Sequence, residues 1–118
     1  MLDLSIVVPV YNEIESIASL CEKIHESIQS LDQSYEIILV DDGSTDGTWE
    51  KMVELSGVYP HLNLIRLRSN FGQTAAMSAG FSECEGSIVI TLDADLQNDP
   101  SDIWFILTAM WVSLRVNL

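Results

Sequence analysis

Basic residues are scarce in this chain of 118 residues, where five Lys and Arg stand against 18 Asp and Glu and the formal net charge is −13. Such a charge repels nucleic acid phosphates and anionic lipid surfaces, so we expect no nucleic acid partner. An anionic ligand can approach clustered acids only where a cation or backbone N–H groups intervene. The charge balance therefore modestly favours a metal site.

Cysteines and long apolar runs are also few. Cys21 and Cys84 lack Cys-x-x-Cys spacing and each falls in a helical pattern, which predicts buried thiols in a reducing compartment. The N-terminus lacks the basic residues and cleavage site of a signal peptide. The apolar part of residues 103–118 is shorter than the ~20 residues of a membrane span. We therefore expect a cytoplasmic location, at most at the cytoplasmic face of a membrane, and no transmembrane segment in this chain.

Short apolar runs alternate with amphipathic stretches along the chain. Continuous apolar or β-branched runs predict buried strands, and the last of them is expected to be covered on both faces. The four predicted strands are Leu4–Val10, Tyr35–Val40, Leu62–Leu67 and Ile88–Leu92. Strands that alternate with helices over short connections predict an α/β fold, a Rossmann-like and mostly parallel sheet in which helices follow the strands.

The helices between these strands follow from apolar spacing and from residues that start or stop a helix. One stripe at spacings of three and four predicts the first helix, with Asn12 as its cap. Asp46 is expected to cap the second helix and Gly57 to end it. After Gly72, small residues predict a third helix packed closely on the sheet, and Asp99-Pro100 predicts the start of a fourth. The inward residues are expected to be Ile14, Ile17, Cys21, Ile24, Ile28 and Leu31 in the first helix and Trp49, Met52, Val53 and Leu55 in the second. The small residues on the faces of the third helix are Ala75, Ala76, Ala79 and Gly80.

Acidic residues follow three of the four predicted strands. Glu13 follows the first, Asp41 and Asp42 the second, and Asp93 and Asp95 the fourth, with the amide of Gln97 close behind. Open α/β sheets bind ligands outside the carboxyl ends of their strands, so these acids should converge on one functional edge. Their oxygens suit Mg²⁺ or Mn²⁺. The alternative is a set of solvated turns, with Glu13 only a first-turn acid that the helix dipole favours. Asp95 is the hardest residue to explain in that way.

Four motifs in order and in register resemble glycosyltransferase family 2. They are Val8–Glu13, Val40–Thr48, Asn70–Ala76 and Asp93–Gln97. The Asp-Ala-Asp-Leu-Gln form is most similar to the branch that charges polyprenyl phosphates, such as dolichol-phosphate mannosyltransferase and undecaprenyl-phosphate sugar transferases. The resemblance covers about residues 4 to 102 and implies the N-terminal, nucleotide-binding part of a GT-A fold.

The resemblance also implies roles for individual residues. Pro9, Tyr11 and Glu13 would line the nucleotide pocket, Asp41 would contact the base or ribose, and Asp42 would shape the same loop. Asp93 would lie near the ribose and the metal, while Asp95 and Gln97 would hold Mg²⁺ or Mn²⁺ against the donor's diphosphate; Asp93 and Asp95 would be the catalytic pair. The implied reaction moves a sugar, with inversion, from a nucleotide-diphosphate sugar to an acceptor, expected to be a polyprenyl phosphate lipid.

The pattern departs from the family after Asp102. Residues 1–102 form the expected nucleotide-sugar-binding part, and residues 103–118 an atypical apolar helix or tail through which the chain could associate. We therefore expect a C-terminally truncated fragment that lacks the acceptor-binding half. Two other functions stay open: a remnant that at most binds nucleotide, and a receiver-like signalling domain. The receiver needs a lysine at a late strand end, whereas Lys23 and Lys51 both fall in predicted helices.

Overall fold

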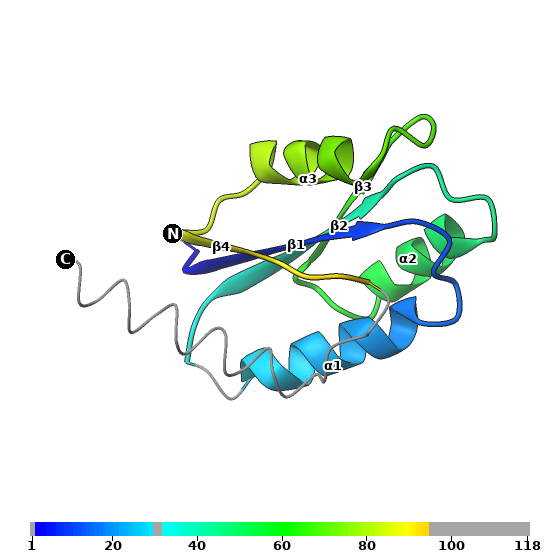
Figure 1. Cartoon of the computed structure of the whole chain (residues 1–118). Coiled ribbons are helices and arrows are strands. Elements are labelled where there is room, and N and C mark those ends of the chain that lie inside the picture. Colours follow the sequence, from blue (N-terminus) through cyan, green and yellow to red (C-terminus); the bar gives the residue numbers. More distant parts are fainter. Residues whose placement is uncertain (1, 30–31, 95–118) are drawn as a thin grey trace.

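The computed structural model describes residues 2–29 and 32–94, and it confirms the alternation of strands and helices (Figure 1). The predictions for Leu31, Asp95, Gln97, the fourth helix and the apolar segment 103–118 lie outside the described residues. The elements are β1 (Leu4–Val10), α1 (Ile17–Gln29), β2 (Tyr35–Asp41), α2 (Thr48–Ser56), β3 (Leu62–Arg66), α3 (Gln73–Ser82) and β4 (Ile88–Thr91).

The four strands form one sheet in the order β3-β2-β1-β4, and all of their pairings are parallel. Leu4 of β1 is paired with Tyr35 on one side and with Ile88 on the other. The chain therefore builds outward from β1 through β2 and β3, and then crosses back to place β4 on the opposite side of β1. Ligand sites in open α/β sheets lie where the strand order reverses, outside the carboxyl ends. That position falls between the ends of β1 and β4.

Helices cover both faces of the sheet, with α1 and α2 on one face and α3 on the other (Figure 1). The predicted stripe of α1 is buried at Ile17, Cys21, Ile24 and Ile28. Two predictions of inward residues were wrong. Ile14 precedes the helix and is exposed, and Val53 on α2 is 48% exposed. In α2 the predicted Met52 and Leu55 are buried and Trp49 packs against the core in a partly buried position, and Thr48 is buried in addition.

The small residues of α3 do allow close packing on the sheet. Ala76 is fully buried against the central strands. A Cβ atom added at Gly80 would clash with Cγ1 of Val7 on β1 and would lie 3.2 Å from Cγ2 of Val40 on β2. The absence of a side chain at this position therefore sets how near α3 approaches the sheet, and with it the place where the α3 N-terminus meets the strand ends.

Strand β4 differs from the prediction that both of its faces are covered. Ile88 and Ile90 are buried, but Val89 is 37% exposed and Thr91 is exposed as well. The reason is position, because β4 is the edge strand of the described sheet and α3 packs over β1 and β2. An apolar run in the sequence indicates that a strand is hydrophobic, but it does not show which helix, if any, covers each of its faces.

A buried carboxylate ties the amino ends of the strands together. Glu36 of β2 accepts hydrogen bonds from Ser5 Oγ at 2.6 Å, from Asn63 Nδ2 at 3.0 Å and from the N–H of Glu85 at 2.7 Å. Ser5 in turn accepts from the N–H of Gly86 at 2.7 Å. A buried charge is tolerated only when it is satisfied in this way. The network links β1, β2, β3 and the turn before β4 at the end of the sheet opposite the carboxyl edge.

Among the helices that the structure describes, none is long and apolar enough to span a membrane.

Candidate functional site

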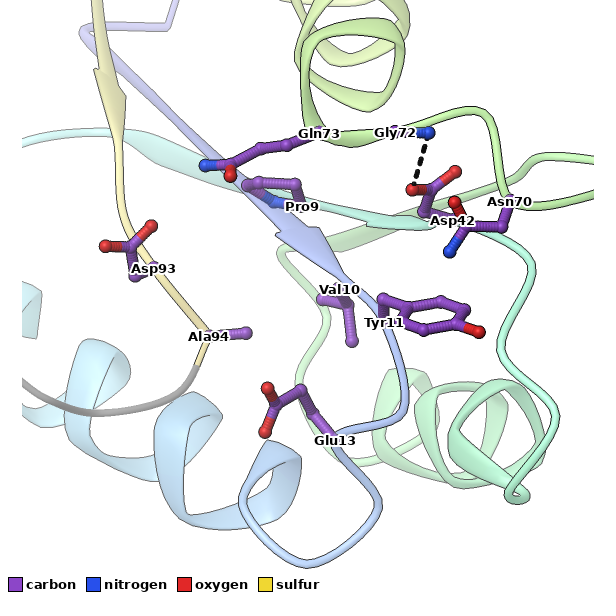
Figure 2. A pocket seen from close by; sticks show the side chains of 10 residues that line it. All are labelled: Pro9, Val10, Tyr11, Glu13, Asp42, Asn70, Gly72, Gln73, Asp93 and Ala94. Atoms are coloured by element: carbon purple, nitrogen blue, oxygen red, sulfur yellow. Dashed lines mark hydrogen bonds between the residues drawn. The ribbon is translucent and has the colours of Figure 1, made fainter.

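A pocket of about 330 Å³ opens at the carboxyl edge of the sheet, beside the reversal of strand order (Figure 2). It is enclosed by the ends of β1 and β4, the first residue after β2, and the segment that leads into α3. Its lining residues are Pro9, Val10, Tyr11, Glu13, Asp42, Asn70, Gly72, Gln73, Asp93 and Ala94. Three of these ten are acidic, and none of the ten is Lys, Arg or His. The lining of the pocket therefore carries negative charge only.

The structure brings together most of the residues that the sequence singled out. Pro9, Tyr11, Glu13, Asp42 and Asp93 all line this pocket, although they come from three separate segments of the chain. The expected convergence of acids from the ends of β1, β2 and β4 is therefore observed for the described residues. Asp95 and Gln97, the other predicted metal ligands, lie outside the described part of the chain.

Asp41 is the predicted nucleotide-binding residue that does not line the pocket. Successive side chains of a strand point to opposite faces, so Asp41 and its neighbour Asp42 cannot both face the same space. Asp41 is fully buried, and its Oδ1 accepts from the N–H of Ser44 at 3.2 Å. Its Oδ2 lies 4.0 Å from Nε of Arg66, whose guanidinium lies 5.1 Å from the centre of the Trp49 ring. Asp41 thus supports the turn after β2 from the α2 side of the sheet.

Asp42 faces the pocket side and holds the turn before α3. Its Oδ1 accepts from the N–H of Phe71 at 2.8 Å, and its Oδ2 accepts from the N–H of Gly72 at 3.0 Å (Figure 2). Gly72 has a φ of 104°, a conformation that favours glycine. With only 4% of its surface exposed, Asp42 fixes the segment that brings Asn70, Gly72 and Gln73 to the pocket wall.

The loops after β1 and β2 are joined by side-chain to backbone hydrogen bonds. The N–H of Asn12 donates to Ser44 Oγ at 2.9 Å, and the N–H of Glu13 donates to Thr48 Oγ1 at 2.9 Å. The Asn12 side chain accepts from the N–H of Thr45 at 2.8 Å, and its backbone has a φ of 52°. Asn12 therefore connects the loop after β1 to the loop after β2 and is not the predicted cap of α1. Together these bonds fix the backbone on either side of Tyr11 and Glu13.

Asp46 completes this interloop connection. It lies just before Gly47, the N-cap of α2, and its Oδ1 accepts from the N–H of Thr48 at 3.0 Å and from the Thr48 hydroxyl. Its Oδ2 accepts from the N–H of Ile14 at 3.3 Å. Desolvation acts to raise the pKa of the Asp46 carboxyl, but the bonds from Thr48 and Ile14 outweigh it and leave the pKa below its ordinary value of 3.8. Asp46 is thus held in its ionised form.

The donor chemistry of the pocket fits a hard divalent cation. Asp93 is exposed at its rim, and carboxylate oxygens are the ligands that Mg²⁺ and Mn²⁺ prefer. Within residues 2–29 and 32–94, no group of three His, Cys, Asp or Glu side chains is arranged to hold a metal ion. Asp93 can therefore supply part of a metal site whose other expected ligands, Asp95 and Gln97, come two and four residues later in the sequence.

Sequence reasoning missed part of the pocket wall. Asn70, Gly72 and Gln73 line it, whereas the segment after Gly72 was expected mainly to pack on the sheet. A glycine at the start of a helix that follows a strand is a sign of close backbone approach, and it could have directed attention to this turn. Val10 and Ala94 could not have been found in this way, because nothing in their chemistry separates them from core residues.

Comparison with known proteins agrees with the geometry. Residues 5–110 match the family described as Glycosyl transferase family 2. Over 100 residues the chain is 48% identical to an undecaprenyl-phosphate 4-deoxy-4-formamido-L-arabinose transferase of Proteus mirabilis, covering 84% of this chain and 31% of that protein. Over 105 residues it is 47% identical to a dodecaprenyl-phosphate galacturonate synthase of Rhizobium johnstonii, covering 86% and 30%. The chain thus spans less than a third of these relatives.

Among solved structures, a mannosyltransferase from Pyrobaculum calidifontis in complex with GDP-Man and Mn²⁺ superimposes with a TM-score of 0.65 at 27% identity. The aligned region covers 80% of this chain and 30% of that protein. This likeness confirms the predicted Rossmann-like sheet of the GT-A type. The family match shows that the chain is not a receiver-like signalling domain. The chain belongs to glycosyl transferase family 2.

Proposed function

We propose that this chain forms the donor-binding part of an enzyme that transfers a sugar from a nucleotide-diphosphate sugar to a polyprenyl phosphate. The observation that carries the proposal is the pocket at the carboxyl edge, lined by acids from three segments and by no basic side chain among its ten residues. The two relatives named above are transferases of undecaprenyl and dodecaprenyl phosphate, and they support the choice of acceptor class.

The protein groups would divide the donor between them. Tyr11, which is 44% exposed beside Pro9, offers an aromatic face on which a nucleotide base can lie. Glu13 offers carboxylate oxygens that can accept hydrogen bonds from ribose hydroxyls. Asp42 is already committed to two backbone N–H groups, so its part is to shape the wall on which the base rests.

The charge of the site explains why a cation is needed. A diphosphate beside Glu13, Asp42 and Asp93 would meet three negative side chains and no positive one along the pocket wall. Asp93, with Asp95 and Gln97, would hold Mg²⁺ or Mn²⁺ there. The bound ion would neutralise the charge that develops on the departing nucleotide diphosphate.

The acceptor chemistry makes few demands on this part of the chain. A phosphate acceptor is already ionised at neutral pH, so its attacking oxygen needs little help from a general base. Attack in line with the departing diphosphate would invert the anomeric carbon. The residues that grip the lipid phosphate are expected in the part of the relatives' length that this chain does not span.

Calorimetric titration of the 118-residue chain with UDP and with GDP, each with Mn²⁺ or with a chelator, tests the proposal. We expect binding of at least one nucleotide with Mn²⁺ and none with the chelator. Asp93→Asn should weaken the metal-dependent binding roughly tenfold, the loss expected for one charge-assisted contact.

The matched control is Glu54→Gln, which removes one negative charge from an exposed side chain on α2 and should leave binding unchanged. Binding that is indifferent to metal would favour a nucleotide-binding remnant over the transferase. Absence of binding to either nucleotide would contradict the proposed function.

A further inference from the structure

Ser16, the residue just before α1, contacts both sides of the pocket without being part of its lining. Its Oγ lies 2.7 Å from Oε2 of Glu13 and 3.3 Å from the carbonyl oxygen of Ala94. Glu13 follows β1, and Ala94 follows Asp93 beyond the end of β4. One half-buried hydroxyl therefore lies between the acid that follows β1 and the Asp93–Ala94 segment that follows β4.

The hydroxyl carries a single proton and so has a choice of acceptors. A third one, the Glu13 carbonyl oxygen at 3.4 Å, already accepts from two backbone N–H groups and is the most distant of the three. The Glu13 carboxylate is the stronger acceptor, because bonds to a charged oxygen are shorter and about twice as strong as neutral ones, and the 2.7 Å distance agrees with that order. When Glu13 turns to a ligand, the proton is free to point to the Ala94 carbonyl instead. That donation would fix the backbone next to Asp93.

Backbone hydrogen bonds on both sides of Ser16 determine what a change of its acceptor would affect. The N–H groups of Ser16 and Ile17 both donate to the Glu13 carbonyl, at 3.1 and 2.9 Å, so Ser16 is held rigidly beside Glu13. On the other side, the last described ladder bond at the end of β4 runs from the N–H of Leu92 to the Val7 carbonyl at 3.1 Å. Beyond Leu92 the chain leaves the sheet, yet Ala94 is buried at 6% exposure.

We propose that Ser16 is a positioning residue that couples ligand contact at Glu13 to the placement of the Asp93–Ala94 segment. This inference rests on the proposed function, because the Asp93 segment is there assigned to the metal. Ser16 touches neither nucleotide nor metal, and its effect passes through Glu13 on one side and the Ala94 backbone on the other. It makes the site respond to the nucleotide by tightening the metal position.

The test compares the wild-type chain with Ser16→Ala, with Ser16→Thr as the conservative variant and with Ser56→Ala as a control. Ser56 also donates its hydroxyl to a backbone carbonyl, that of Val53 at 2.6 Å, but it lies at the end of α2 away from the pocket. The first readout is the Mn²⁺ concentration that gives half-maximal UDP binding. We expect it to rise roughly fivefold in Ser16→Ala, as for one lost hydrogen bond, and to return in Ser16→Thr. Because coupling between two ligands is reciprocal, UDP affinity at saturating Mn²⁺ should fall by a similar factor in Ser16→Ala, whereas Mn²⁺ affinity without UDP should stay near the wild-type value.

The second readout is hydrogen exchange with UDP and Mn²⁺ bound, the state in which Ser16 is proposed to donate to the Ala94 carbonyl. Exchange at the Leu92 amide should then be roughly fivefold faster in Ser16→Ala than in wild type, and the two chains should exchange alike without ligand. The amide of Ile88, at the other end of β4, should keep its rate, as should both amides in the Ser16→Thr and Ser56→Ala chains.

The outcomes separate the two proposals. If wild type binds no UDP at any Mn²⁺ concentration, the proposed function fails and this inference falls with it. If wild type binds UDP with Mn²⁺ but the Mn²⁺ requirement or the Leu92 exchange with both ligands bound is the same in Ser16→Ala, this inference alone is overturned. The same holds if Ser16→Thr behaves like Ser16→Ala, because the effect would then not come from the hydroxyl.

Discussion

Replacing Gly80 with alanine tests how closely α3 must lie on the sheet. The new Cβ would clash with Val7 Cγ1 and sit 3.2 Å from Val40 Cγ2, and both valines are fully buried and β-branched, so neither can rotate away at small cost. Overpacking of a tight core costs up to about 3 kcal/mol. The better helix propensity of alanine returns about 1 kcal/mol. We therefore expect a net loss of about 2 kcal/mol from the free energy of unfolding.

Urea unfolding followed by circular dichroism measures this loss, and thermal unfolding should show a midpoint lower by roughly 8 °C, at about 4 °C per kcal/mol for a chain of this size. The matched control is Gly57→Ala. Gly57 has a φ of −75° and no atom nearer than 3.4 Å to its added Cβ, so that change should be neutral or stabilise by about 0.5 kcal/mol. If Gly80→Ala is as stable as wild type, the described fit of α3 on β1 and β2 is refuted.

Three further predictions concern stability and reactivity. Glu36→Ala leaves the buried hydroxyl of Ser5 and the part-buried N–H groups of Asn63 and Glu85 without their acceptor, so urea unfolding should show a loss of about 3 kcal/mol; an unchanged midpoint would contradict the network around Glu36. Because the pKa of Asp46 is lowered in the folded chain, its bonds stabilise fully above its ordinary pKa and are lost as the pH falls through the folded pKa. Asp46→Ala should therefore be less stable near neutral pH and show a smaller loss of stability on acidification than wild type; parallel pH profiles would count against this. Burial raises the pKa of Cys21 to about 11, so iodoacetamide should modify it only on unfolding, after the less buried Cys84; rapid native labelling of Cys21 would contradict its burial.

Much of the fold could be predicted because its determinants are local in sequence. Apolar runs, helical stripes and stop residues located the strands and helices of residues 2–94 to within a few positions. The parallel sheet followed from their alternation. The sequence did not show which element packs against each face of each strand. Val89 belongs to an apolar run and yet is exposed, because the described sheet ends at β4 and α3 packs elsewhere.

The candidate site could be predicted in its location but not in the role of each residue. Carboxyl ends of parallel strands share an edge, so the meeting of Glu13, Asp42 and Asp93 followed from topology. The roles of Asp41 and Asp42 were harder, because two adjacent identical residues differ only in the face that the strand gives them. Ser16 was beyond reach, since its importance comes from its distance to Ala94, far away in sequence.

Paramagnetic broadening by Mn²⁺ in an NMR spectrum tests the central claim most directly, because it locates the cation on the folded chain. With UDP present, we predict that Mn²⁺ broadens the amide signals of Tyr11, Glu13 and Asp93 and leaves sharp those of His61 and Ser34, at the amino edge of the sheet. Broadening centred on the amino edge, or none around the pocket, would contradict the account.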